Sequence, residues 1–307
     1  MKAYYKHIGL EVLCGLVGKS RQAFYDKMHR EEKEKFDASI VVDLVRRERK
    51  IAKRVGAKKL FRILKEELLA HGIAIGNQRF ADILRDNHLL VLRRRSKPKL
   101  TDSRHLLPVY PNIARNLHID RSEMLWYSDI TYIKVFDAFC YLILITDAYS
   151  RKVMGYNFGR NMTAKFCVKA LQMACENRSY SDRKLIHHTD RGSQYCAKEY
   201  IEVLKSNCIV ISMTEHGDPL ENPLAERMNR TFKEVFGLDE NFPTFDQAKQ
   251  QTDAAVNYYN NRLPHSSIDM LTPDQAHHKI GKLKKHWIWY WKESQFYQTE
   301  DNYYTPL

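Results

Sequence analysis

The pattern of apolar and polar positions changes character near residue 123. From there, runs rich in Ile, Val, Leu and Tyr predict three strands, and alternating helical and apolar stretches continue after them. The predicted elements are strands at 123–136, 139–146 and 151–158, a helix at 163–177, a strand at 184–189, a helix at 197–206, a strand at 208–213 and a final helix after Asn222. This order predicts an α/β fold with a mixed five-stranded sheet and helices packed on it.

The first hundred residues show only helical patterns. Apolar spacing at Ile8–Val17, a break at Gly18–Ser20 and a helix over 21–29 outline a helix-turn-helix, although any two-helix hairpin has the same outline. The charged stretch at 30–35 is interpreted as a solvated linker or a helix end. Three more helices are predicted between residues 37 and 92, the third capped by Asn77. The N-terminal third is therefore expected to be an all-helical region of helix-turn-helix type.

Charge is distributed unevenly along the chain. The whole sequence has 50 Lys and Arg against 37 Asp and Glu, a net charge of +13, and residues 1–100 carry 25 − 12 = +13 of it. A basic N-terminal part predicts a polyanionic partner such as DNA, because Lys and Arg displace counterions from phosphates. A solvated basic face would give the same count. The basic arm at Val91–Lys99 supplies candidate phosphate or minor-groove contacts, namely Arg93, Arg94, Arg95 and Lys97.

The amino-acid composition narrows the cellular compartment in which the protein is expected. The six cysteines are scattered without a CxxC pair, so neither a disulfide framework nor a zinc module is expected, and a reducing cytoplasm is the natural compartment. No apolar stretch approaches the roughly 20 residues that span a bilayer, so no membrane partner is expected. The predicted parts are a helix-turn-helix-like segment at 1–35, a helical DNA-binding domain with a basic arm at 36–100, a linker at 101–122, a catalytic core at 123–280 and an aromatic basic tail at 281–307.

Three acidic residues stand where metal ligands are expected. Asp129 lies in the first predicted strand, Asp190 closes the fourth, and Glu226 lies in the first turns of the last helix. Neighbouring strands are only about 4.8 Å apart, so carboxylates distant in sequence can converge. Such carboxylates can hold two Mg²⁺ ions for in-line phosphoryl transfer.

Another acid at a strand end, Asp147, could be a fourth ligand. We interpret it as a turn residue paired with Ser150 or Arg151.

The helix that carries Glu226 has a polar face. Asn229, Arg230 and Lys233 share that face with Glu226, because positions i, i+3, i+4 and i+7 of a helix lie side by side. An acid, an amide and two cations suit a metal at one end and DNA phosphates beyond it. A solvated helix face would look the same.

Several motifs together resemble a known family. They are WxxDITY at Trp126–Tyr132, HxDxGxQY at His188–Tyr195, NxxxE at Asn222–Glu226 with Lys233 seven positions after the glutamate, and the later YYNNRLPH at Tyr258–His265 and LTP at Leu271–Pro273. They resemble the insertion sequence 3 family of bacterial transposases, in the DDE integrase superfamily. The resemblance implies a ribonuclease-H-like catalytic core, a triad of Asp129, Asp190 and Glu226, and Lys233 as a DNA-contacting lysine. One departure is Pro223, where the family commonly has alanine.

The resemblance also implies an activity and partners. We expect a DNA transposase that uses Mg²⁺ or Mn²⁺, with two ions, to cleave strands at the element's ends and to join them by 3′-hydroxyl attack. Expected partners are the terminal inverted repeats, the target DNA, further copies of the chain on DNA, and an upstream-frame helix-turn-helix protein joined by frameshifting. The expected location is the bacterial cytoplasm, at the nucleoid. Two alternatives remain: a nuclease on the same fold, and a non-catalytic DNA-binding protein.

Overall fold

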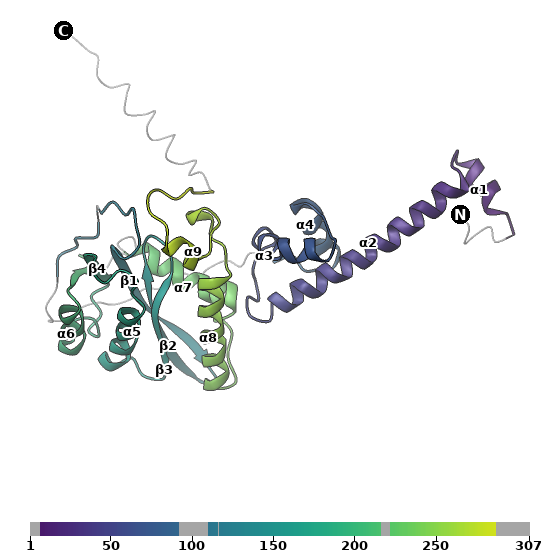
Figure 1. The fold of residues 1–307 in the computed structure, drawn as a ribbon. Helices are drawn as coiled ribbons and strands as arrows, with labels where there is room; N and C mark the ends of the chain where they lie inside the picture. The colour runs from purple at the N-terminus through teal and green to yellow at the C-terminus, as the bar shows by residue number, and fades with distance from the viewer. Residues whose placement is uncertain (1–6, 92–109, 116, 216–221, 287–307) are drawn as a thin grey trace, which may run out of the picture. The chain divides into compact units, whose positions relative to one another are not determined.

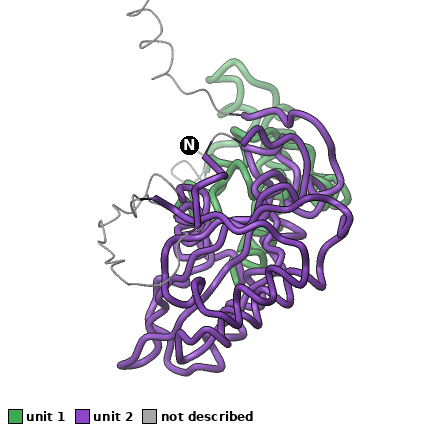
Figure 2. The backbone as a smooth tube through the Cα atoms, turned by 90° about the vertical axis from the view of Figure 1, so that its left-hand side faces the viewer, with its two compact units in different colours: residues 1–50, 55–93 green, residues 51–54, 94–307 purple. Residues whose placement is uncertain are grey.

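The computed structural model describes residues 7–91, 110–115, 117–215 and 222–286 (Figure 1). The chain divides into two compact units, one of residues 1–50 with 55–93 and one of residues 51–54 with 94–307 (Figure 2). The predicted arm residues Arg93, Arg94, Arg95 and Lys97, and the tail beyond residue 286, lie outside the described residues. No helix in the described ranges is long and apolar enough to cross a bilayer.

The first unit is all helical, as predicted. Its helices are α1 (Leu10–Leu16), α2 (Arg21–Glu48), α3 (Ala57–Ala70) and α4 (Asn77–Asp86). The Ser20 hydroxyl accepts a hydrogen bond from the Ala23 backbone, which confirms it as the N-cap of α2. The cap of α4 is Gly76, not Asn77, which is the first helical residue. Leu60, Leu64, Leu68, Phe80 and Leu84 form the buried stripes of α3 and α4.

Helix α2 continues through the charged stretch at 30–35. The prediction of a linker or helix end there is wrong. Glu and Lys are good helix formers, and the stretch contains no Gly or Pro that would interrupt the hydrogen-bond ladder. Charge pairs one turn apart, such as Lys27 with Glu31 at 3.6 Å, add a little support. Hydrophobic spacing alone cannot show this continuity, because the middle of α2 is exposed on all sides.

The second unit is built on a five-stranded sheet with the order β3-β2-β1-β4-β5. The strands are β1 (Leu125–Val135), β2 (Ala138–Asp147), β3 (Val153–Gly159), β4 (Leu185–Thr189) and β5 (Ile209–Met213). The first three form antiparallel pairs, whereas β4 runs parallel to both β1 and β5. The mixed sheet predicted from the order of elements is confirmed.

Helices lie on the two faces of this sheet (Figure 1). On one face, α5 (Ala164–Glu176) and α6 (Lys198–Ser206) pack on each other. On the other face lie α7 (Pro223–Phe236) and α8 (Phe245–Asn261), and the short α9 (Pro273–His277) packs against α8. One core cluster joins α5 and α6 to residues such as Trp126 and Ile143. Gly155 lets α5 approach β3 closely, because a Cβ there would lie 2.1 Å from the Ala170 carbonyl oxygen.

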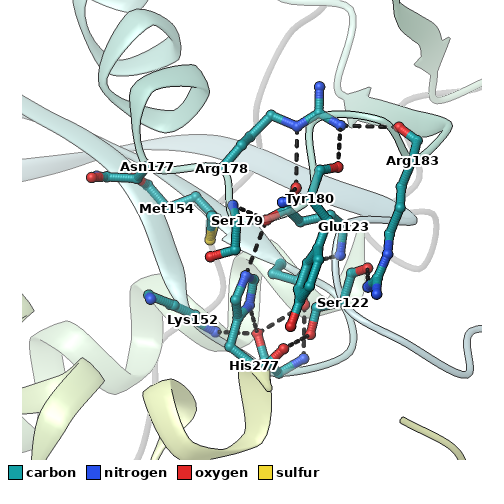
Figure 3. A network of polar contacts seen from close by, with 12 residues as sticks. Ser122, Glu123, Lys152, Met154, Asn177, Arg178, Ser179, Tyr180, Arg183 and His277 are labelled. Atoms are coloured by element: carbon teal, nitrogen blue, oxygen red, sulfur yellow. Dashed lines mark hydrogen bonds and ion pairs between the residues drawn. The ribbon is translucent and has the colours of Figure 1, made fainter. Parts of the chain in front are cut away.

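A buried polar network fixes the start of β1 (Figure 3). Glu123 is fully buried, and its backbone is left-handed, with φ at 59°. One carboxylate oxygen accepts from the Ser179 backbone at 2.6 Å and lies 3.2 Å from His277 Nε2, while the other accepts from Arg178 Nε at 3.1 Å. Burial by itself would raise the pKa of Glu123, but these hydrogen bonds outweigh it and the pKa is lowered. Residues far apart in sequence are thus held together by one carboxylate.

The same network continues to the end of β2. His277 Nδ1 lies 2.9 Å from Ser150 Oγ, and that hydroxyl donates to Asp147 Oδ1 at 2.8 Å. The Asp147 carboxylate also accepts from the backbones of Ser150, Tyr149 and Glu123. The interpretation of Asp147 as a turn residue paired with Ser150 is confirmed. Ser150, His277 and Glu123 are linked in a row by these contacts, as in a catalytic triad. All three side chains are fully buried, so the network serves structure and not nucleophilic chemistry.

Residues 51–54 belong to the second unit, although the predicted boundaries placed them in the N-terminal domain. Arg54 binds the C-terminal end of α7 and the turn after it. Its backbone donates to the Val235 carbonyl at 2.9 Å, and its guanidinium lies 2.8 Å from both Asp239 Oδ1 and Glu240 Oε1. A cation at a helix C-terminus also interacts favourably with the helix dipole. Arg54 therefore supports the helix that carries Glu226.

Replacing the buried acid tests the network. We expect Glu123→Gln to lower the free energy of unfolding at neutral pH by about 3–5 kcal/mol, because Arg178 would stay buried without its partner. The lowered pKa means that the carboxylate stabilises the fold fully above its unfolded-state value of about 4.3, and less as the pH falls through the folded value. The difference between wild type and variant in urea unfolding should therefore shrink between pH 5 and pH 3. A difference in unfolding free energy that does not depend on pH would contradict the network. The control is Glu199→Gln, which changes an exposed glutamate of α6.

The Arg54 contacts predict a stability effect in the catalytic unit. Arg54→Ala removes charge-assisted hydrogen bonds at the end of α7, and we expect a loss of about 1–3 kcal/mol in unfolding free energy. Thermal unfolding followed by circular dichroism measures it. Arg62→Ala changes an exposed arginine of α3 and should be neutral. Equal midpoints for both variants would show that Arg54 does not hold α7.

Candidate active site

The sheet brings Asp129 and Asp190 together. In the parallel pairing of β1 with β4, Tyr127 is opposite His188, and the two aspartates follow two positions further along each chain. Because side chains alternate between faces, both carboxylates extend from the same face of neighbouring strands. Burial raises the pKa of Asp129 to about 7, and the negative charges of Asp190 and, less strongly, Glu226 act in the same direction.

Helix α7 is fastened to β1 at Ser128 and at Asp129. The Asn222 side chain donates to the Ser128 carbonyl at 3.1 Å, and Asn229 Nδ2 donates to Asp129 Oδ2 at 2.8 Å. The other oxygen, Asp129 Oδ1, accepts from the Ile130 backbone at 2.8 Å. Pro223 is the first residue of α7, where its missing N–H costs nothing, so this departure from the family pattern leaves the helix start intact.

The HxDxGxQY motif positions Asp190. The Gly192 backbone donates to Asp190 Oδ1 at 3.0 Å, and a Cβ at Gly192 would lie only 3.0 Å from the same oxygen. A glycine thus lets the turn close on the carboxylate. Tyr195, at the end of the motif, is buried, and its hydroxyl lies 3.1 Å from Ser128 Oγ, beside Asp129. The motif therefore ties the turn after β4 to β1.

Glu226 lies at the edge of this arrangement. It is exposed on the first turn of α7, one turn before Asn229, and its charge acts on Asp129. Within the described residues, no three His, Cys, Asp or Glu side chains are close enough together to hold a metal ion. The structure thus brings Asp129 and Asp190 together and leaves Glu226 at the rim, so a three-carboxylate metal site stays a prediction.

The side-chain oxygens around Asp129 fit a hard divalent cation. Asn229 is 8% exposed, and its Oδ1 is buried with no hydrogen-bond partner in the part of the chain that the structure describes. Asn222 Oδ1 is likewise buried and has no hydrogen-bond partner among the described residues. Carboxylate and amide oxygens are the ligands that Mg²⁺ and Ca²⁺ take, and orphaned acceptors beside crowded carboxylates gain from a nearby cation.

The predicted DNA contacts on α7 have different surroundings. Arg230 is exposed and Lys233 is half-buried, so both keep access to a ligand on this helix face. We predicted a DNA contact for Asn229, but its side chain is buried against Asp129, and its role here is to position that carboxylate. The spacing of α7 correctly placed Asn229 beside Glu226 but could not show that it points toward the sheet.

Two family models, both described as "Integrase core domain", match residues 120–219 and 207–273. The chain is similar to the Insertion element IS600 uncharacterized 31 kDa protein of Shigella sonnei, with 27% identity over 88% of this chain and 99% of that protein. It is 30% identical to Transposase InsF for insertion sequence IS3A of Escherichia coli (strain K12), over 70% of this chain and 75% of InsF.

Among solved structures, this protein is similar to a chain of the simian T-cell lymphotropic virus intasome in complex with PP2A regulatory subunit B56 gamma. The identity is 22% and the TM-score 0.44, over 75% of this chain and 78% of the other.

The crowding of two carboxylates predicts a stability cost. In metal-free protein, Asp129→Asn removes one of two neighbouring negative charges, and the Asn229 amide can turn so that its orphaned oxygen accepts from the new side chain. We expect the thermal midpoint in EDTA to rise by a few degrees, which corresponds to about 1–2 kcal/mol. Asp137→Asn, at the exposed hairpin turn, is the control. A lower midpoint for Asp129→Asn would mean that the two charges are not in conflict.

Proposed function

The chain belongs to the insertion-sequence transposases of the IS3 type, and we propose that Asp129, Asp190 and Glu226 are its catalytic carboxylates. A DNA transposase with an integrase core is a polynucleotidyl transferase, which exchanges phosphodiester bonds in DNA. The observation that carries the residue assignment is the pair of adjacent aspartates, one with its pKa raised to about 7, beside an orphaned amide oxygen. Perturbed carboxylates of this kind are typical of functional sites.

Two divalent cations, Mg²⁺ or Mn²⁺, held by Asp129, Asp190 and Glu226, would neutralise charge on the phosphodiester and lower the pKa of the attacking hydroxyl. The chain's own residues prepare the site. Asn229 and the Ile130 backbone fix both oxygens of Asp129, and the Gly192 backbone fixes Asp190. Glu226, at the rim of α7, completes the set of carboxylates from the side on which DNA arrives.

The proposed reaction has two bond exchanges. In cleavage, a water oxygen bonds to phosphorus while the P–O3′ bond breaks, which releases a 3′-hydroxyl end. In joining, that 3′-hydroxyl bonds to a second phosphorus and displaces another 3′-hydroxyl. One P–O bond forms for each that breaks, so no covalent link between protein and DNA and no energy-rich cofactor is needed. The same carboxylates serve both steps, because both are in-line displacements at phosphorus.

The partners follow from this activity. We propose that the DNA partners are the element's terminal inverted repeats and the target, that copies of the chain associate on DNA, and that an upstream-frame helix-turn-helix protein can be fused to it. The excess of 25 − 12 = +13 charges in residues 1–100 supports DNA binding by that region. Arg230 and Lys233 on α7 support a DNA path beside Glu226. Residence in the bacterial cytoplasm at the nucleoid would follow from a DNA substrate.

Removing one carboxylate tests the assignment. We expect Asp190→Asn to reduce both cleavage of a labelled duplex carrying the element's end and joining of a supplied 3′-hydroxyl end by about 10³-fold or more, in Mg²⁺. Binding of the same duplex should be nearly unchanged. Asp182→Asn, an exposed aspartate in the loop before β4, is the matched control. An active Asp190→Asn protein would overturn the assignment, and cutting without joining by wild type would indicate a nuclease instead.

A further inference from the structure

A cavity of about 460 Å³ in the second unit is lined in part by β1 and α7, the elements that carry Asp129 and Glu226. Its lining includes Tyr127 of β1, Arg151 after β2, the first turn of α7 at Pro223 and Leu224, and Lys282 near the end of the described chain. We infer that this cavity binds a backbone phosphate of the DNA strand whose neighbouring phosphodiester reacts. The inference rests on the proposed function and assigns a further DNA-binding site to it.

Arg151 is the main reason for this assignment. Its backbone is left-handed, with φ at 68°, and its side chain is half-buried. The guanidinium makes one hydrogen bond, from Nη1 to the Ala148 carbonyl at 2.5 Å, and has no ion pair among the described residues. The neighbouring carboxylate of Asp147 already accepts four hydrogen bonds. A half-buried guanidinium with unused donors and no ion-paired carboxylate among the described residues is suited to an anionic ligand.

The other ionisable groups that line the cavity in the described part of the chain leave it positive. Lys282, Lys285 and His118 line it together with Arg151. Among the residues that the structure describes, its one lining carboxylate is Asp120, which binds the Arg121 guanidinium at 3.1 Å. The local field therefore favours a phosphate over a neutral or cationic ligand.

The tyrosines of the cavity offer a hydroxyl more readily than a stacking surface. The ring of Tyr149 is buried, and its hydroxyl donates to the Gly281 carbonyl at 2.7 Å. The ring of Tyr127 packs edge-on against His188, with centroids 5.4 Å apart. The Tyr127 hydroxyl has no hydrogen-bond partner in the described part of the chain, so it can donate to a ligand beside Arg151. These groups suit a phosphate oxygen better than a base.

The position of the cavity identifies the source of the phosphate. Tyr127 precedes Asp129 by two residues on the same face of β1, a distance of about 7 Å, and the first turn of α7, which carries Glu226, lines the cavity at Pro223 and Leu224. Phosphates of one DNA strand recur at about 3.4 Å along the helix axis. A strand that presents one phosphodiester to the carboxylates can therefore place another, one to three nucleotides away, in this cavity.

A coupling experiment tests the inference. Binding is measured in an Asp190→Asn background with duplexes of the element's end, each carrying one neutral methylphosphonate in place of one phosphate. We expect a substitution within three nucleotides of the cleaved bond to weaken binding about tenfold, and Arg151→Gln or Lys282→Gln to abolish that sensitivity. Lys279→Gln, an exposed lysine that does not line the cavity, should keep it. Lys282→Gln carries the test if Arg151→Gln does not fold.

Contrary outcomes are distinguishable. Equal sensitivity to every methylphosphonate in the wild-type and cavity variants would overturn the inference. The inference would also be overturned if inorganic phosphate stabilised the protein in an Arg151-dependent way while no methylphosphonate substitution changed DNA binding through Arg151. The ligand of the cavity would then be free phosphate. If the wild-type protein cuts and joins DNA normally but the methylphosphonate effect does not depend on Arg151 or Lys282, only the proposed cavity site is ruled out. Coupling together with an active Asp190→Asn protein would instead remove the carboxylate assignment alone.

Discussion

Electrostatic repulsion between two neighbouring carboxylates is the constraint on which the rest of the catalytic unit depends. Asp129 and Asp190 extend from adjacent parallel strands, and burial together with the charge of Asp190 raises the pKa of Asp129 to about 7. Folding alone gains nothing from this arrangement. It persists because hydrogen bonds from Ile130, Asn229 and Gly192 hold the carboxylate oxygens from several directions. A cation would remove the conflict, which is the physical basis of the proposed chemistry.

The surrounding structure keeps the elements that carry these groups in place. The buried carboxylate of Glu123 joins the start of β1 to the loop after α5 and to α9, through Arg178 and His277. Arg54 holds the far end of α7, whose first turn carries Glu226 and whose second carries Asn229. The sheet thus fixes two aspartates, while a helix fastened at both ends presents the glutamate. The positive cavity at Arg151 extends the same face along the proposed DNA path.

Much of this could be predicted from the sequence, because strong local patterns coincide with the fold. Apolar runs predicted the five strands, and the motifs placed Asp129 within β1 and Asp190 directly at the end of β4. The remaining features depend on contacts between distant residues. Nothing local to Glu123 shows that it is buried against Arg178 and His277, and helical spacing could not show that Asn229 faces the sheet. The residues 51–54 join the catalytic unit through long-range ion pairs that no pattern reveals.

Direct titration with Mn²⁺, followed by electron paramagnetic resonance, is the measurement that bears most closely on the carboxylate pair. We expect saturable Mn²⁺ binding by the wild-type protein that competes with Mg²⁺, and loss of that binding when either Asp129 or Asp190 is changed to asparagine. Binding that survives both substitutions, or wild-type protein that binds no Mn²⁺ even with DNA present, would contradict it.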